Sequence, residues 1–274
     1  NPGKHQEKGP GAGLYMTFST EEQEAVEVKV GLSYTSIENA RFNRETEAAD
    51  VTFDQAKKNA TDVWNESLSR IYVEGGKETD KVKFYTGLFH ALLGRGLASD
   101  ANGYYPKNNG TVGRIALDEE GNPVHQHYNT DAIWGGFWNL TQLWSLAYPE
   151  YYSDWIKSQL LVYQDTGWLG DGIACSKYVS GVGTNFTSLA IAADNCGIRD
   201  FDVKQGYEAA LKNEVEWRGR LEGAGKMDVR QFVERGYSPY EKRFDMVTRE
   251  EGSGFGASHT MEYSFSSFAV SQFA

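Results

Sequence analysis

The chain has 274 residues, of which 40% are hydrophobic and 24% are charged, and its formal net charge at pH 7 is -11. This is the composition of a globular protein with enough apolar residues to bury a core. It disfavours nucleic-acid binding, because phosphate contacts require clustered Lys and Arg that this charge balance does not supply.

Cysteine and apolar content narrow the class of protein further. Cys175 and Cys196 are too few for a disulfide framework or a four-ligand zinc site, so we expect both to be free thiols. No apolar run approaches about 18 residues, so we expect no membrane-spanning helix in these residues. Aromatic residues make up 14% of the chain. We expect most of them in the core, although flat rings also stack on the apolar faces of sugars.

The first residues differ in pattern from the rest. Residues 14–18 and 26–34 alternate apolar and polar side chains, which predicts two β-strands. Because two strands are not stable alone, we interpret residues 1–35 as the C-terminal remnant of a β-sandwich domain. The chain opens without an initiator Met. We therefore expect it to be a fragment whose other strands precede Asn1.

Helical patterns follow. Residues 36–51 are polar, with helical spacing at Ile37, Ala40 and Arg41, and predict a connecting helix. Thr52 and Gln55 have the spacing of a capping box. An apolar stripe follows them, formed by Phe53, Ala56, Ala60, Val63, Trp64, Leu68 and Ile71.

Further helices are predicted over residues 79–97, 131–147, 150–166, 185–196, 203–220 and from 258 to the end. Because strands and helices do not alternate, a doubly wound sheet is disfavoured. We predict a mostly α protein in which residues 52–274 form the N-terminal part of an α/α toroid, an incomplete (α/α)6 barrel. Helical spacing continues to the last residues, so we expect the chain to stop inside an element.

The first candidate site lies around residues 125–138. Asp131 is placed at a helix start, where the helix dipole favours a carboxylate, and either binds substrate or only caps the helix. Trp134 and Trp138 share a helical face; we expect a sugar platform at Trp134 and core packing at Trp138. His125 and His127 have strand-type metal spacing without a third ligand, so we do not expect a transition-metal site.

The second candidate site is the glycine-rich turn at residues 167–172. Flexible glycines can expose Trp168 and Asp171 together at the rim of a pocket, where both would bind substrate. Ordinary turn chemistry explains Asp171 equally well.

The third candidate is Glu262, a carboxylate inside an apolar and aromatic helix. Its neighbours Met261, Tyr263 and Phe265 can lower the local dielectric and keep the carboxyl protonated near neutral pH, as a general acid requires. The alternative is a buried Glu bonded to a backbone or Tyr partner. Residue patterns alone favour this alternative.

Four motifs in order resemble glycoside hydrolase family 92, a family of exo-acting α-mannosidases. They are residues 30–43 (VGLSYTSIENARFN), 64–71 (WNESLSRI), 84–90 (FYTGLFH) and 102–104 (NGY). The likeness continues through residues 193–198 (ADNCGI) to 260–263 (TMEY), and covers about residues 14–274.

The resemblance implies an N-terminal β-sandwich, a connecting helix and an α/α toroid catalytic domain. It also implies calcium-dependent, inverting hydrolysis of α-linked mannose in a secreted or periplasmic enzyme that acts on glycans, although it places no calcium ligand on these residues. The family's Thr-Leu-Glu-Tyr motif supplies the general acid. It corresponds to Thr260-Met261-Glu262-Tyr263 here, so the resemblance makes Glu262 the expected acid.

Two features depart from the family pattern. In the family, the catalytic base lies in an Asn-Asp-Asp-x-Gly-Gln segment. These 274 residues do not contain this segment, so we expect no turnover from them alone. Most members read Trp-Asp-Thr-Phe-Arg where this chain has residues 134–138 (WGGFW). This loses an Asp and an Arg whose charge-assisted hydrogen bonds are worth about 1.5–3 kcal/mol each, so the preferred sugar or linkage can differ.

Two other functions remain open at this point. The chain can be a glycan-binding or scaffold module without catalysis. It can also be part of an α/α-toroid glycosidase acting on another glycan, with Asp131 or Asp171 in the acid–base roles.

Overall fold

The computed structural model describes residues 9–13, 15–93, 96–129, 136, 139–170, 172–174, 177–179, 197–242 and 252–274. The chain divides into two compact units, Asn1–Val30 and Gly31–Ala274. The described residues of the first unit form turns and segments without regular secondary structure.

The two strands predicted near the N-terminus are wrong for the residues that the structure describes. Residues 15–18 and 26–34 have no strand assignment, and the apolar side chains of the alternating pattern are exposed. A strand requires a partner that completes its hydrogen-bond ladder. Alternation alone does not supply this partner, so the pattern does not produce a sheet here.

Helix α1 (Ile37–Ala48) follows the predicted connector, and Ser36 caps it by accepting a hydrogen bond from the Asn39 N–H at 3.0 Å. Helix α2 (Phe53–Ser69) begins at the predicted capping box of Thr52 and Gln55, which is confirmed. Both begin where a side chain satisfies a backbone N–H group that the helix leaves free.

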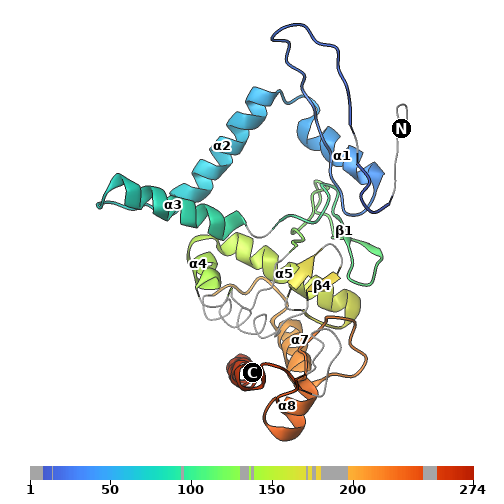
Figure 1. The fold of residues 1–274 in the computed structure, drawn as a ribbon, viewed down its shortest axis with the longest axis vertical. Coiled ribbons are helices and arrows are strands. Elements are labelled where there is room, and N and C mark those ends of the chain that lie inside the picture. Colours follow the sequence, from blue (N-terminus) through green and yellow to red (C-terminus); the bar gives the residue numbers. More distant parts are fainter. Residues whose placement is uncertain are drawn as a thin grey trace. The chain divides into compact units, whose positions relative to one another are not determined.

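Helix α3 (Glu78–Leu93) follows α2 (Figure 1). The Trp64 ring of α2 lies 4.4 Å from the Phe89 ring of α3, measured between centroids. None of the residues of α2 is buried, and its first apolar residue, Phe53, is exposed. The apolar stripe of α2 therefore packs only towards its C-terminal end, where Leu68 reaches the core.

Two short antiparallel hairpins were not predicted. Strand β1 (Tyr104–Pro106) pairs with β2 (Val112–Arg114), and β3 (Gly172–Ala174) pairs with β4 (Lys177–Val179). Each strand has three residues, which is too short for alternation to be recognised.

The core of the second unit is formed mainly by α4 (Leu140–Ala147), α5 (Pro149–Thr166) and α7 (Val203–Val215). Its largest fully buried rings are Trp144, Tyr152 and Trp155. Tyr152 stacks on Trp155 with 6.1 Å between ring centroids. Core packing therefore accounts for these aromatic residues, as the composition predicts.

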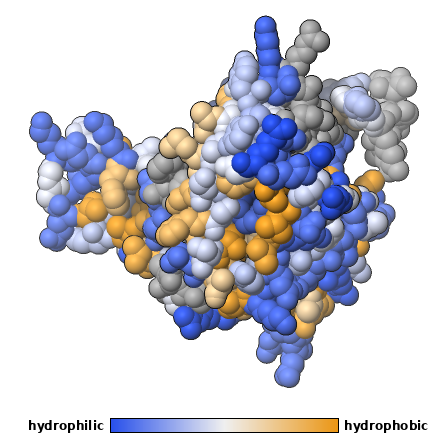
Figure 2. Space-filling model, turned by 90° about the horizontal axis from the view of Figure 1, so that it is seen from below, coloured by the Kyte–Doolittle hydropathy of each residue, from blue (hydrophilic) through white to orange (hydrophobic). Residues whose placement is uncertain are grey.

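Helix α8 (Val229–Arg235) and helix α9 (Gly256–Phe273) complete the second unit and gather with α7 at one end of it, orange to red in Figure 1. Exposed apolar side chains lie among hydrophilic ones on the face shown in Figure 2. Helix α8 was missed from the sequence, because seven residues do not give a clear period.

The prediction of a mostly helical protein is confirmed. The helices predicted over 150–166 and from 258 onward agree with α5 and α9 to within two residues, and that over 203–220 ends at Val215. In the described part of the 131–147 prediction, α4 begins at Leu140, and the 185–196 prediction lies outside the described residues. Within the part of the chain that the structure describes, no helix is long and apolar enough to cross a membrane.

A buried polar cluster joins the first family-like motif to Asp100 and Ala101, which directly precede the fourth. The Asp100 carboxylate accepts hydrogen bonds from Ser33 Oγ (3.0 Å), Thr35 Oγ1 (2.5 Å) and Asn43 Nδ2 (2.8 Å). Asn43 Oδ1 in turn accepts from the Ala101 N–H at 2.9 Å. These bonds fix the start of α1 against the turn that leads into β1, over 57–67 residues of sequence separation.

Candidate functional site

Helix α9 carries Glu262, the expected general acid. Its side chain is half-buried, and among the residues that the structure describes its carboxylate has no hydrogen-bond or ion-pair partner. It therefore is not the fully buried, bonded Glu of the alternative reading. A half-buried carboxyl that has no partner among the described residues is able to approach a ligand, whereas a carboxyl locked in a buried ion pair is not.

The expected apolar enclosure of Glu262 is not what the structure shows. Met261 is 74% exposed and Phe265 is also exposed, while Tyr263 is fully buried and directed elsewhere. Successive helical residues point about 100° apart, so adjacent side chains cannot all surround one carboxyl. Glu262 shares its helix face with Ser266 and Ala269, which are spaced four and seven residues further on.

A buried ion pair holds α9 on one side. The Lys226 ammonium binds the Glu214 carboxylate of α7, and it also donates to Ser266 Oγ of α9 at 2.7 Å. Ser266 and Ser267 both donate to Glu214, the latter at 2.9 Å. We call these four residues the Lys226 cluster. Burial lowers the pKa of Lys226, and the Glu214 carboxylate opposes this shift.

A second buried network holds α9 near its N-terminus. The Asp228 carboxylate is fully buried and lies 3.3 Å from His259 Nδ1 and 3.2 Å from the Tyr263 hydroxyl, which donates to it. Ser238 Oγ donates to the other carboxylate oxygen. We call Asp228, Ser238, His259 and Tyr263 the Asp228 cluster.

The two clusters bracket Glu262 along the sequence of α9. His259 lies three residues before it, Tyr263 directly after it and Ser266 four residues after it. All three side chains are buried and bonded to groups outside α9. These contacts fix the rotation of α9 about its axis, and with it the direction in which Glu262 projects.

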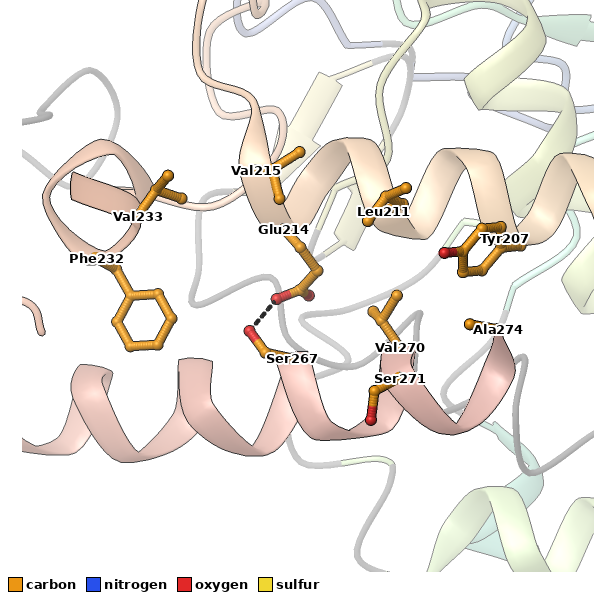
Figure 3. A pocket seen from close by; sticks show the side chains of 10 residues that line it. All are labelled: Tyr207, Leu211, Glu214, Val215, Phe232, Val233, Ser267, Val270, Ser271 and Ala274. Carbon is orange, nitrogen blue, oxygen red and sulfur yellow. Dashed lines mark hydrogen bonds between the residues drawn. The ribbon is translucent and has the colours of Figure 1, made fainter. Parts of the chain in front are cut away.

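A cavity of about 530 Å³ lies between α7, α8 and α9. Figure 3 shows Leu211 and Val215 of α7, Phe232 of α8 and Val270 of α9 on its apolar walls. The Glu214 carboxylate points across it to Ser267. Because Lys226 compensates the charge of Glu214, this cavity offers a ligand little net charge. Glu262 is not one of its lining residues.

Trp168 is not at a rim. It is 3% exposed, and the Lys212 ammonium lies 4.4 Å from the centroid of its ring system. A Cβ atom at Gly225, where φ is +66°, would lie 3.3 Å from the ring. The glycine-rich turn thus places the indole in the core. The prediction that Trp168 is exposed at the rim of a pocket is therefore wrong. A substrate contact by Trp168 stays a prediction.

Three other predicted substrate-binding residues, Asp131, Trp134 and Asp171, lie outside the described residues, as do Cys175 and Cys196. Of the Trp134–Trp138 segment, only Gly136 is described. The roles of Asp131, Trp134 and Asp171 therefore remain predictions.

His125 and His127 lie in the segment that leads towards α4. His127 is buried, and its Nδ1 lies 2.9 Å from Ser158 Oγ of α5, while the Nδ1 of His125 lies 3.0 Å from the Gln126 carbonyl oxygen. Burial, and secondarily the charge of His125, lowers the pKa of His127 to about 4. Its ring is thus a neutral part of the core at neutral pH.

The described residues do not offer a metal site. Across the described ranges, no group of three or more His, Cys, Asp or Glu side chains is placed to hold an ion. Hard cations such as calcium require six to eight oxygen ligands, and the described carboxylates do not converge in this way.

Sequence reasoning missed Lys226, Asp228 and His259. One available signal was the spacing of His259, three residues before Glu262 and so on a neighbouring part of the same helix face. No local pattern indicates that Lys226 or Asp228 is buried, because their partners lie 10 to 40 residues away in the sequence.

The model of the glycosyl hydrolase family 92 catalytic domain matches residues 39–274. No curated protein sequence gives a significant match.

Several solved structures are similar to this chain. The family GH92 alpha-mannosidase BT3965 from Bacteroides thetaiotaomicron matches with a TM-score of 0.74 and 19% identity, over 88% of this chain and 30% of that one. The family GH92 inverting mannosidase BT2199 from the same organism matches with a TM-score of 0.68 and 23% identity, over 88% and 31%. At these identities the matches show a shared fold. The chain spans less than a third of each matched chain.

Proposed function

Because the chain belongs to glycosyl hydrolase family 92, we propose that it forms the part of an inverting, exo-acting α-mannosidase that carries the general acid, Glu262. The observation that carries this proposal is the placement of Glu262. It stands in the Thr-x-Glu-Tyr motif, and its carboxylate is free of partners among the described residues while its neighbours on α9 are held by buried networks.

The proposed chemistry follows from this placement. Glu262 in its protonated form donates a proton to the glycosidic oxygen as the bond from that oxygen to the anomeric carbon breaks. A water molecule attacks the anomeric carbon from the opposite face of the sugar and loses its proton to a second carboxylate. In inverting enzymes the two carboxyl groups stand about 6.5–9.5 Å apart to leave room for this water.

We propose that the second carboxylate comes from residues other than these 274. The family's base segment, Asn-Asp-Asp-x-Gly-Gln, does not occur in this sequence. The chain covers only about 30% of the solved α-mannosidase BT3965. The 274 residues alone are therefore expected to lack turnover.

The remaining features of the proposal rest on the family resemblance. They are an α/α toroid, a calcium ion at the sugar and a secreted or periplasmic location. The substrate contacts proposed for Asp131, Trp134, Trp168 and Asp171 rest instead on the residue patterns around them. The difference at residues 134–138, where Gly135 and Gly136 replace an Asp and a Thr, bears on which sugar or linkage is preferred.

The test is hydrolysis of an α-linked mannobiose by the product of the longest reading frame that encodes these residues. Proton NMR at early times should show β-mannose as the first product, because inversion converts the α-linkage to the β-anomer. The 274-residue protein should release no mannose under the same conditions. Formation of α-mannose first would exclude an inverting mechanism, and failure to cleave any α-mannoside would exclude the proposed activity.

A further inference from the structure

Asp228 has a backbone conformation that side-chain-bearing residues rarely adopt. Its φ is +45° and ψ is 18°, in the left-handed region, at the residue that precedes α8. Asp tolerates this region better than most residues, but the conformation still costs free energy. The side chain does not use its position to cap α8, because it makes no capping hydrogen bond there.

The side chain of Asp228 is directed to α9 instead. It is 0% exposed, and its carboxylate meets His259 and Tyr263, which lie on either side of Glu262 in the sequence. The single proton of the Tyr263 hydroxyl is shared between Asp228 and the Met227 carbonyl oxygen, which lies closer at 2.5 Å. The backbone at residues 227–228 thus binds α9 through both a carbonyl and a carboxylate.

A buried carboxylate in a strained backbone is costly unless the surrounding structure stabilises it. Ser238 adds a third bond to Asp228, and the Ser238 N–H donates to Thr260 Oγ1 of α9 at 2.9 Å. Thr260 lies two residues before Glu262. The described hydrogen-bond partners of the Asp228 side chain therefore either belong to α9 or bind α9 close to Glu262.

We infer that Asp228 is a positioning residue for Glu262, acting through His259 and Tyr263. This inference rests on the proposed role of Glu262 as general acid. The Asp228 cluster sets the rotation and axial position of α9 at the turn that carries Glu262, so that the carboxyl is held where the glycosidic oxygen of the substrate arrives. Displacement of a catalytic group by about 1 Å can cost about 100-fold in rate.

The test compares two substrates of the full-length enzyme. Methyl α-mannoside has a poor leaving group that must be protonated as it departs, whereas fluoride leaves α-mannosyl fluoride without needing a proton from a general acid. Asp228→Asn preserves the size of the side chain and removes its charge. We expect it to lower kcat for methyl α-mannoside about 10-fold to 100-fold more than kcat for the fluoride.

Asp165→Asn is the matched control. Asp165 is also a carboxylate with a hydroxyl and a cation as partners, Tyr105 and Lys107, and its side chain is only 8% exposed, but it lies at the end of α5. Its substitution should change the two kcat values by the same factor. If Asp228→Asn does not fold, Ser238→Ala removes a single bond to Asp228, and should shift the ratio of the two rates in the same direction.

Glu262→Gln separates failure of this inference from failure of the proposed function. If Glu262→Gln discriminates between the substrates and neither Asp228→Asn nor Ser238→Ala does, the positioning role is overturned while the general acid stands. If Glu262→Gln lowers both rates equally, Glu262 is not the acid, and the inference fails with it. Discrimination by Glu262→Gln together with either cluster variant supports both.

Discussion

Lys226 and Glu214 form an ion pair that is closed to solvent, with side chains 0% and 5% exposed. The pair joins the loop before α8 to α7, and through Ser266 and Ser267 it reaches α9. Three segments of the second unit thus meet at one carboxylate. The carboxylate also faces the cavity between α7, α8 and α9. Because Lys226 neutralises it, the cavity carries little net charge.

Removing one member of this pair should be much worse than removing both. We expect Lys226→Met to lower the free energy of unfolding by about 3–5 kcal/mol, because Glu214 would remain buried without a compensating charge. The double variant Lys226→Met with Glu214→Leu should recover most of this loss. Urea denaturation followed by circular dichroism measures both. Strictly additive effects of the two single substitutions would contradict the buried pair.

The polar cluster around Asp100 should contribute strongly to stability. Asn43→Ala removes two hydrogen bonds donated by Nδ2, to Asp100 and to the Leu32 carbonyl oxygen, and one accepted by Oδ1. We expect a loss of about 2–3 kcal/mol, since each bond contributes about 1 kcal/mol and buried partners are left unsatisfied.

Asn59→Ala is the control for that experiment. Asn59 is exposed within α2, and its substitution should stay within about 0.5 kcal/mol. If Asn43→Ala changes the free energy of unfolding by as little in the same urea titration, the contacts of Asn43 with Asp100 and Ala101 do not stabilise the fold.

His127 should make folding depend on pH. Its pKa is lowered from 6.5 to about 4 in the folded state, so between these values the unfolded chain binds the proton more readily. The stability from burying a neutral ring is complete above about pH 6.5 and is lost as the pH falls towards 4, by about 3 kcal/mol in total.

The measurement is urea unfolding of the wild type and of His127→Asn at intervals from pH 7 to pH 4. Asn can still bond Ser158 but does not titrate. The difference in free energy of unfolding between the two proteins should therefore shrink as the pH falls through this window. A constant difference from pH 7 to pH 4 would show that His127 does not enter the core as a neutral ring.

The fold could be predicted where information is local. The capping box at Thr52 and Gln55 and the helical spacing after it predict α2. The helical spacing over residues 36–51 likewise predicts α1, which begins at Ile37. The same approach failed for residues 15–18, whose alternation predicts a strand that has no partner to pair with. It also missed the hairpin of β1 and β2, because three residues per strand carry too little pattern.

The candidate site could be predicted only in part. The motif around Glu262 is local, and so its resemblance to a family motif was visible in the sequence. The exposure of Trp168 was judged from flexible glycines, but its environment is set by Lys212 and Gly225, more than 40 residues away in the sequence. The side-chain partners of Asp228 lie 10 to 35 residues away in the sequence, so no short segment indicates that this carboxylate is buried.

The most direct test of the account measures Glu262→Gln in the full-length enzyme on methyl α-mannoside and α-mannosyl fluoride. General-acid catalysis contributes about 100-fold to 10,000-fold to such reactions. The account predicts a loss of this size in kcat for the methyl glycoside and a far smaller loss for the fluoride. Equal rates for Glu262→Gln and the wild type on methyl α-mannoside would contradict it, because another group would then be protonating the leaving oxygen.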